Sequence, residues 1–251
     1  GQRLYAQHCQ TCHMEDGSGL RGLIPPIAKA DYLQTHRDEL ACLMVNYPST
    51  FPYEFVLMRG DNMYGGEKPA DFKAKFENVY QELLDNKVTF YASLGNHDES
   101  NQRFYDHFNM KGEEYYRIKK GNVAFYALNS NYMDKRQLKW LEDELAKDDS
   151  EWKIAFFHHP PYSSGKKHGS SSSLREVVEP IFLKYGVNAV FAGHEHFYER
   201  VKPQKGIYYI TQGGAAKLRR GNIADNSAMT AKGFDTDNSF TLVELEGDTM
   251  Y

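Results

Sequence analysis

The chain has 251 residues, and its 30 Lys and Arg against 34 Asp and Glu give a net charge of −4. This balance excludes the basic surface of a typical nucleic-acid-binding protein, and 41% apolar with 25% charged residues excludes an extended disordered chain. Three cysteines are too few for a disulfide framework, and no apolar run approaches the ~18 residues of a membrane span, so we expect no transmembrane segment in this sequence.

The first 50 residues carry the cysteine motif Cys9-x-x-Cys12-His13. C-x-x-C-H is the attachment motif of a c-type haem. Its spacing lets two thiols reach the two vinyl groups of one porphyrin and places the histidine under the iron as an axial ligand. A redox-active thiol pair and half of a zinc site are the alternatives. No second cysteine pair accompanies the motif and no predicted strand precedes it, so we favour haem.

From residue 51 onward, short apolar runs alternate with segments of helical spacing. The apolar runs predict strands at residues 55–58, 88–94, 115–118, 123–128, 154–157, 187–192, 207–211 and 240–245. The helical spacing predicts helices at residues 71–84, 134–147 and 174–185. Asp134 is expected to cap the second helix and Gly186 to end the third. This order of elements predicts an α/β fold, a β-sandwich of mixed sheets flanked by helices.

Four short polar motifs each follow one of the predicted strands. They are Gly60-Asp61-Asn62-Met63-Tyr64, Gly95-Asn96-His97-Asp98, His158-His159-Pro160 and Gly193-His194-Glu195-His196. Open α/β sheets gather their ligand-binding loops at the carboxyl ends of strands. A pair of metals about 3.5–4 Å apart needs a bridging carboxylate, which Asp61 can supply. Each motif alone is usually a turn, but the four together predict a two-metal site with the terminal ligands Tyr64, Asn96, His158, His194 and His196.

Together these motifs resemble those of the calcineurin-like metallophosphoesterases, over about residues 51–246. Within that family the chain is most similar to the purple acid phosphatase branch, because Tyr64 lies three residues after Asp61 and His168 ten residues after His158. The resemblance implies two metal ions, Fe paired with Fe, Zn or Mn. It assigns their ligands as Asp61, Tyr64 and His196 for the first ion, and Asp61, Asn96, His158 and His194 for the second.

The same resemblance implies a phosphoesterase that hydrolyses small-molecule phosphomonoesters by attack of a metal-activated hydroxide. His97 follows the ligand Asn96 and cannot easily point at the same metal, so we expect it to bind a phosphoryl oxygen or protonate the leaving group. His168 matches the other outer histidine of the branch and is expected to share that role, whereas His159 is expected to be structural or substrate-facing. A phosphodiesterase of the same superfamily is one alternative function. A haem electron-transfer or redox protein with a catalytically inactive phosphatase-like scaffold is another.

Residues 3–47 resemble the N-terminal half of a class I cytochrome c. By this resemblance Cys9, Cys12 and His13 hold haem c, and a loop proline such as Pro25 supports the axial histidine. Covalent haem is attached outside the cytoplasm in bacteria, so a periplasmic or otherwise exported protein with a possible redox partner is implied. We therefore expect an incomplete, all-α cytochrome c-like haem-binding segment at residues 1–50. A metallophosphoesterase domain is expected at 51–251.

Both resemblances are incomplete near the junction of these two parts. The metallophosphoesterase family begins with a strand that ends in an Asp ligand of the first metal, and no such strand precedes residue 51. The distal Met and the C-terminal helix of a cytochrome also have no counterpart. One hypothesis is that the sequence omits residues of a longer chain near residues 48–53 and after 251. The rival is a real deletion that leaves the first metal with three protein ligands.

Overall fold

The structure, a computed structural model, describes Met44 and residues 53–215, 217–225 and 227–251. The haem-binding residues that the sequence predicts lie outside this part of the chain, so the haem remains a prediction; they are Cys9, Cys12, His13 and Pro25. In the part that is described, no helix has the length and apolar character needed to cross a membrane.

The larger of two facing sheets has seven strands in the order β3-β4-β5-β6-β8-β7-β9. They are β3 Tyr116–Lys120, β4 Val123–Ala127, β5 Trp152–Phe157, β6 Ala189–Ala192, β7 Tyr198–Val201, β8 Tyr208–Gln212 and β9 Thr230–Phe234. Strands β4, β5, β6 and β8 run parallel, and the other neighbours pair antiparallel. The parallel strands are covered on both faces, which explains why they read as nearly continuous apolar runs.

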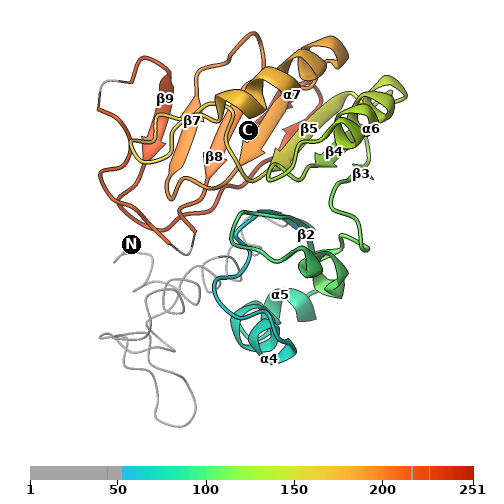
Figure 1. The fold of residues 1–251 in the computed structure, drawn as a ribbon, viewed down its shortest axis with the longest axis vertical. Helices are drawn as coiled ribbons and strands as arrows, with labels where there is room; N and C mark the ends of the chain where they lie inside the picture. Colours follow the sequence, from blue (N-terminus) through green and yellow to red (C-terminus); the bar gives the residue numbers. More distant parts are fainter. Residues whose placement is uncertain (1–43, 45–52, 216, 226) are drawn as a thin grey trace.

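Helices α6 (Lys135–Ala146) and α7 (Ser172–Tyr185) lie on the outer face of this sheet (Figure 1). The Asp134 side chain accepts hydrogen bonds from the backbone N–H groups of the first turn of α6 and so satisfies donors that have no partner within the helix. Gly186 ends α7 with a left-handed φ of 70°. Both sequence predictions are confirmed, and Leu141 of α6 is fully buried in the core beneath the helices.

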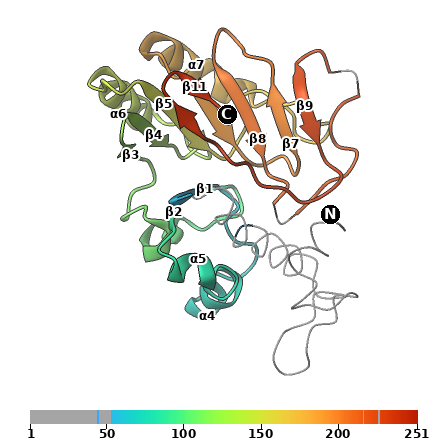
Figure 2. The same cartoon turned by 180° about the vertical axis from the view of Figure 1, so that it is seen from behind.

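A second, two-stranded sheet faces the inner side of the large one. It consists of β1 (Phe55–Arg59) and β2 (Thr89–Ser93), which pair in parallel. Phe55 of β1 packs edge-on against Phe125 of β4, with ring centroids 5.4 Å apart. The outer side of the small sheet is covered by α4 Pro69–Phe72, a π-helix at Lys73–Glu77, α5 Gln81–Asp85, and 3-10 turns at Ser100–Phe104 and Asp106–Phe108. The layers are therefore helix, sheet, sheet, helix (Figures 1 and 2), which confirms the predicted sandwich.

The single helix expected at residues 71–84 is wrong, because this stretch folds as α4, a π-helical turn and α5. The apolar residues still face the core, and Phe76 in the π turn is 1% exposed. Its ring contacts Phe90 and Phe108, each with a centroid separation of 5.0 Å. Tyr80 then leaves helical geometry, with φ −108° and ψ 19°. Tertiary packing of Phe76 thus overrides the helical spacing.

The strand expected at residues 240–245 is also wrong. Residues 239–243 have no strand pairing. Leu245–Glu246 (β10) pairs with Thr249–Met250 (β11), and Glu244 exchanges two backbone hydrogen bonds with Tyr251 beside this pair. The sequence analysis also missed β7, which lies between β8 and β9, and β9, which lies at the edge of the sheet. β7 carries the charged pair Glu199 and Arg200, and β9 is mostly exposed, so neither shows the apolar run that predicts a buried strand.

Candidate metal centre

All four polar motifs lie at the carboxyl ends of strands, two following the small sheet and two following the large one. Close backbone approach between them requires glycine. A Cβ on Gly60, which has φ +78°, would lie 2.6 Å from Gly95 Cα and 2.7 Å from His158 Nδ1. A Cβ on Gly193 would lie 2.7 Å from the Arg59 carbonyl oxygen. Glycine at these positions allows the two sheets to bring their loops into one site.

Two residues of the motifs adopt left-handed backbone conformations although they are not glycine. Asp61 has φ 51° and His194 has φ 65°. Such conformations cost free energy for residues with a Cβ and are concentrated at functional sites. They turn both side chains inward at the point where the two sheets meet.

The first group of donor atoms surrounds Nε2 of His158, which is fully buried. Nδ1 of His158 lies 2.9 Å from the Arg59 carbonyl oxygen and donates its proton there, which leaves a lone pair on Nε2. That Nε2 lies 2.9 Å from Asn96 Oδ1, 3.3 Å from Asp61 Oδ1 and 3.0 Å from His194 Nδ1. Lone-pair atoms therefore converge from four side chains, and a cation among them would satisfy them together.

The second group of donor atoms surrounds the other oxygen of Asp61. Tyr64 Oη donates to Asp61 Oδ2 at 2.8 Å and lies 3.4 Å from His196 Nε2. His196 Nδ1 is buried and has no hydrogen-bond partner among the described residues. Asp61 thus contributes one oxygen to each group, and the described residues give the second group three donors.

The three histidines of these groups have neutral, lone-pair-bearing rings at neutral pH. Burial lowers the pKa of His158 and of His194 to about 3, and it lowers the pKa of His196 to about 4. A neutral imidazole is the form that binds a metal ion. The donor set is one carboxylate, one phenol, one amide and three imidazoles, which suits transition metals such as Fe and Zn. The chemistry of these residues therefore fits a two-metal centre.

Three further histidines surround this centre: His97 and His168 are exposed, and His159 is half-buried. The ring of His168 is 4.3 Å from that of His194, and the ring of His97 is 5.0 Å from that of Tyr64. Both side chains are exposed, so both can meet a substrate. His159 also reaches the first group of donors and forms a three-histidine cluster with His158 and His194. Its Nδ1 lies 2.9 Å from Ser130 Oγ, which occupies one side of its ring.

Sequence reasoning quoted Asp98 within a motif but gave it no role. Its carboxylate accepts the backbone N–H groups of Asn62, Met63 and Gly95, and so joins the loops that follow β1 and β2. Burial raises its pKa to about 6. The sequence signal that could have identified it is an acid two residues after the predicted ligand Asn96, in a turn between two strands.

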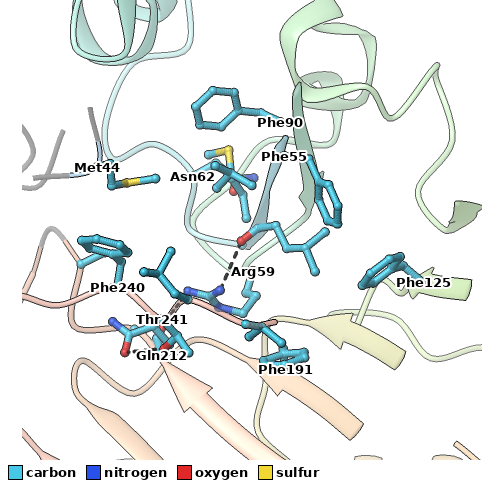
Figure 3. Close-up of a pocket in the computed structure, with 18 of the residues that line it drawn as sticks. Met44, Phe55, Arg59, Asn62, Phe90, Phe125, Phe191, Gln212, Phe240 and Thr241 are labelled. Carbon is cyan, nitrogen blue, oxygen red and sulfur yellow. Dashed lines mark hydrogen bonds between the residues drawn. The ribbon is translucent and has the colours of Figure 1, made fainter. Parts of the chain in front are cut away.

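A cavity of about 530 Å³ lies between the two sheets (Figure 3), and residues of both donor groups are among those that line it. All five residues of β1 line it from one side and residues 240–245 line it from the other. Within the described residues β1 pairs only with β2, and the cavity lies between β1 and residues 240–245. Aromatic rings from both sheets line the cavity, including Phe90, Phe125 and Phe191, and the Arg59 guanidinium in it donates to the Gln212 carbonyl at 2.8 Å.

The family model for calcineurin-like phosphoesterases matches residues 31–198, more than half of the chain. The chain belongs to the calcineurin-like phosphoesterase family. The match begins within residues 1–50, the range that the sequence assigned to a haem-binding segment, and it gives the cytochrome resemblance no support.

Sequence relatives come from the purple acid phosphatase group. Rabbit (Oryctolagus cuniculus) tartrate-resistant acid phosphatase type 5 is 29% identical over 212 residues, which are 70% of this chain and 63% of that protein. Purple acid phosphatase 15 of Arabidopsis thaliana is 30% identical over 199 residues, 71% of this chain and 35% of that protein. The matched part of the chain thus spans less than two thirds of the length of either relative.

Solved structures show the same fold at low sequence identity. GAP50, described as the anchor in the inner membrane complex of Plasmodium, aligns with a TM-score of 0.63 and 20% identity over 82% of this chain and 75% of its own. Purple acid phosphatase PPD1 of yellow lupin (Lupinus luteus) seeds aligns with a TM-score of 0.61 and 16% identity over 90% of this chain and 46% of its own. The expected metallophosphoesterase fold is confirmed.

Proposed function

We propose that the chain is a purple acid phosphatase-like enzyme that hydrolyses phosphomonoesters at a two-metal centre. One observation carries the proposal: the donor atoms of the six ligands expected from the sequence converge around the two oxygens of Asp61. The proposed assignment gives Asp61, Tyr64 and His196 to one ion, and Asp61, Asn96, His158 and His194 to the other. The purple acid phosphatase relatives support Fe paired with Fe, Zn or Mn.

The protein's own residues orient these donors and move protons. When bound, the metal pair supplies Lewis acidity, which lowers the pKa of water and neutralises charge on a phosphoryl group. The Arg59 carbonyl fixes the tautomer of His158, and Asp61 sets the spacing of the two donor groups. His97 and His168, both exposed at the rim, bind a phosphoryl oxygen or protonate the leaving group. Lys217, whose Nζ lies 4.9 Å from the Tyr64 ring centroid, adds positive charge on the side where an anionic substrate approaches.

The test is steady hydrolysis of an aryl phosphate by the chain loaded with Fe and Zn. We expect turnover that a chelator abolishes and that Fe and Zn together restore. The reason is that the proposed reaction needs the metal pair to activate water, and the converging donor atoms can hold that pair. A panel containing bis-aryl phosphates separates phosphomonoester from phosphodiester hydrolysis. A fully loaded chain with no turnover on any of these substrates would contradict the proposal and favour the alternative of an inactive scaffold.

We also propose a covalent haem in the N-terminal segment, which rests only on the motif Cys9-x-x-Cys12-His13. We expect the chain, when matured with a haem-attachment system, to retain one haem after denaturation, and the double variant Cys9→Ser/Cys12→Ser to lose it. Intact mass and haem absorbance of the denatured chain are the measurements. Retention of haem would support export to the periplasm and a redox partner. A denatured wild-type chain without haem would contradict the proposed haem and remove the basis for export and for a redox partner.

A further inference from the structure

Glu195 lies between two of the proposed ligands, His194 and His196, yet its carboxylate points to a different part of the molecule. The side chain has no solvent exposure. One oxygen, Oε1, accepts hydrogen bonds from the backbone N–H groups of His168 at 3.1 Å and Gly169 at 2.7 Å. These donors belong to the loop between β5 and α7. Glu195 therefore connects the ligand-bearing turn after β6 to the loop that carries His168.

The other oxygen of Glu195 connects a third segment. Oε2 accepts from Asn222 Nδ2 at 2.7 Å, and the Arg219 guanidinium lies 3.9 Å away. The backbone carbonyl of Asn222 in turn accepts a hydrogen bond from the backbone N–H of Lys166 at 2.8 Å. A buried carboxylate is tolerated only when hydrogen-bond donors surround it. Here the donors come from the loop itself, at residues 168 and 169, and from Asn222. The loop is thus held against Glu195 at several points.

The sequence of the loop fits this close approach. A Cβ on Gly165 would collide with Glu195 Oε1, so no side chain fits at that position. Gly169 has φ +71°, a left-handed conformation that turns its N–H toward the carboxylate. The result is that the ring of His168 lies 4.3 Å from the ring of His194. No hydrogen bond to the His168 ring is described, and the backbone N–H of His168 itself donates to Glu195. This contact is therefore the constraint that acts directly on the residue, beside those at Lys166 and Ser170.

We propose that Glu195 is a positioning residue that holds the His168 loop over the metal centre. It acts through the backbone of residues 168 and 169, so that the histidine faces the substrate side of His194. This inference rests on the proposed function where it concerns catalysis. Its structural part stands on contacts within the chain alone, and the test is designed to separate the two.

The first measurement is hydrogen exchange of the amides at residues 166–170 in Glu195→Ala, resolved by overlapping peptides. Hydrogen bonds to a charged acceptor are worth enough that we expect at least about tenfold faster exchange at residues 168 and 169. Glu195→Gln keeps an oxygen acceptor and is expected to show a smaller effect. Unchanged exchange at residues 168 and 169 in a folded Glu195→Ala protein would overturn the proposal.

Glu199→Ala is the matched control. Glu199 is equally buried and anchors the start of the same loop, where its carboxylate accepts from the backbone N–H of Ser164 at 2.9 Å. We expect faster exchange around Ser164 in that variant and little change at residues 168 and 169. An equal effect of both variants along the whole loop would overturn the specific role of Glu195. If Glu195→Ala does not fold, Gly165→Ala is used instead, because its added methyl group would displace the Glu195 carboxylate. Unchanged exchange at residues 168 and 169 in that variant would also overturn the proposal.

The second measurement compares kcat for an alkyl phosphate and an aryl phosphate. The alkyl leaving group needs a proton, so Glu195→Ala and His168→Ala should each lower kcat for the alkyl ester at least about tenfold more than for the aryl ester. The double variant should be no slower than His168→Ala, because both changes remove one function. Equal losses on both esters together with lost metal would overturn the role at His168. If the wild type hydrolyses neither ester, the proposed function fails. The contact between Glu195 and the backbone of residues 168 and 169 is then tested by the hydrogen-exchange measurement alone.

Discussion

Replacement of Asp61 by Asn is expected to lower phosphatase turnover by at least about 10³-fold. Loss of a single transition-state hydrogen-bond donor already costs ~10²–10³ in other enzymes, and Asp61 contributes an oxygen to each of the two donor groups. In Asn, an N–H₂ group replaces one of these oxygens, so one group loses an oxygen ligand and both groups lose the negative charge of the carboxylate. We therefore expect the content of bound metal to fall as well, measured by elemental analysis of the purified variant.

The fold of this variant should be unaffected. Asn is isosteric with Asp and tolerates the left-handed φ of 51° found at this position. Asp134→Asn is the matched control, because it makes the same chemical change at an exposed helix cap that Asn serves equally well. Turnover of Asp61→Asn within about tenfold of the wild type would mean that the metal pair is not organised around this carboxylate.

The helix predictions succeeded where a local signal was sufficient. The capping carboxylate of Asp134 and the left-handed Gly186 mark the limits of α6 and α7, and both act through contacts within a few residues. The helix at residues 71–84 failed because the position of Phe76 depends on Phe90 and Phe108, which come later in the chain. Long-range packing of this kind leaves no trace in the spacing of apolar residues.

The strand expected at residues 240–245 failed for a different reason. An apolar run forms a strand only beside a free strand edge, and the cavity separates this run from β1, whose one partner in the described chain is β2. The sequence-based hypothesis of an absent first strand concerns this same region of the sandwich. Pattern analysis can identify a strand-forming segment, but it cannot supply the neighbour that the segment needs.

The candidate site was more predictable than its surroundings. The carboxyl ends of strands converge in this fold class, so residues that follow four strands could be grouped before any distance was known. The sequence could not give the tautomer of His158, which depends on the Arg59 carbonyl 99 positions away in the chain. It also could not give the role of Glu195, since a carboxylate between two histidines is itself a plausible metal ligand, and only its contacts with residues 168 and 169 show otherwise.

Replacement of Gly95 by Ala is expected to lower turnover by at least about 10²-fold and to destabilise the protein. An added Cβ would collide with the backbone nitrogen and with Oδ1 of Asp61, and neither is the free end of a flexible side chain. Because the loops after β1 and β2 must then separate, the shared carboxylate moves, and a displacement near 1 Å at a reacting centre costs ~10²-fold. Overpacking of this kind costs ~1–3 kcal/mol of stability, measured by denaturant unfolding alongside turnover.

Gly121→Ala separates loss of stability from loss of the site. Gly121 lies in the β3–β4 turn with φ +58°, and an added Cβ there meets nothing within 4 Å. The left-handed backbone alone makes Ala unfavourable by ~1–2 kcal/mol, so the two variants should lose comparable stability. Only Gly95→Ala should lose turnover and metal, because only there does the methyl group press on Asp61. Equal activity in both variants would show that the loops can separate without disturbing the centre, and that the close approach of Gly95 to Asp61 has no part in holding it together.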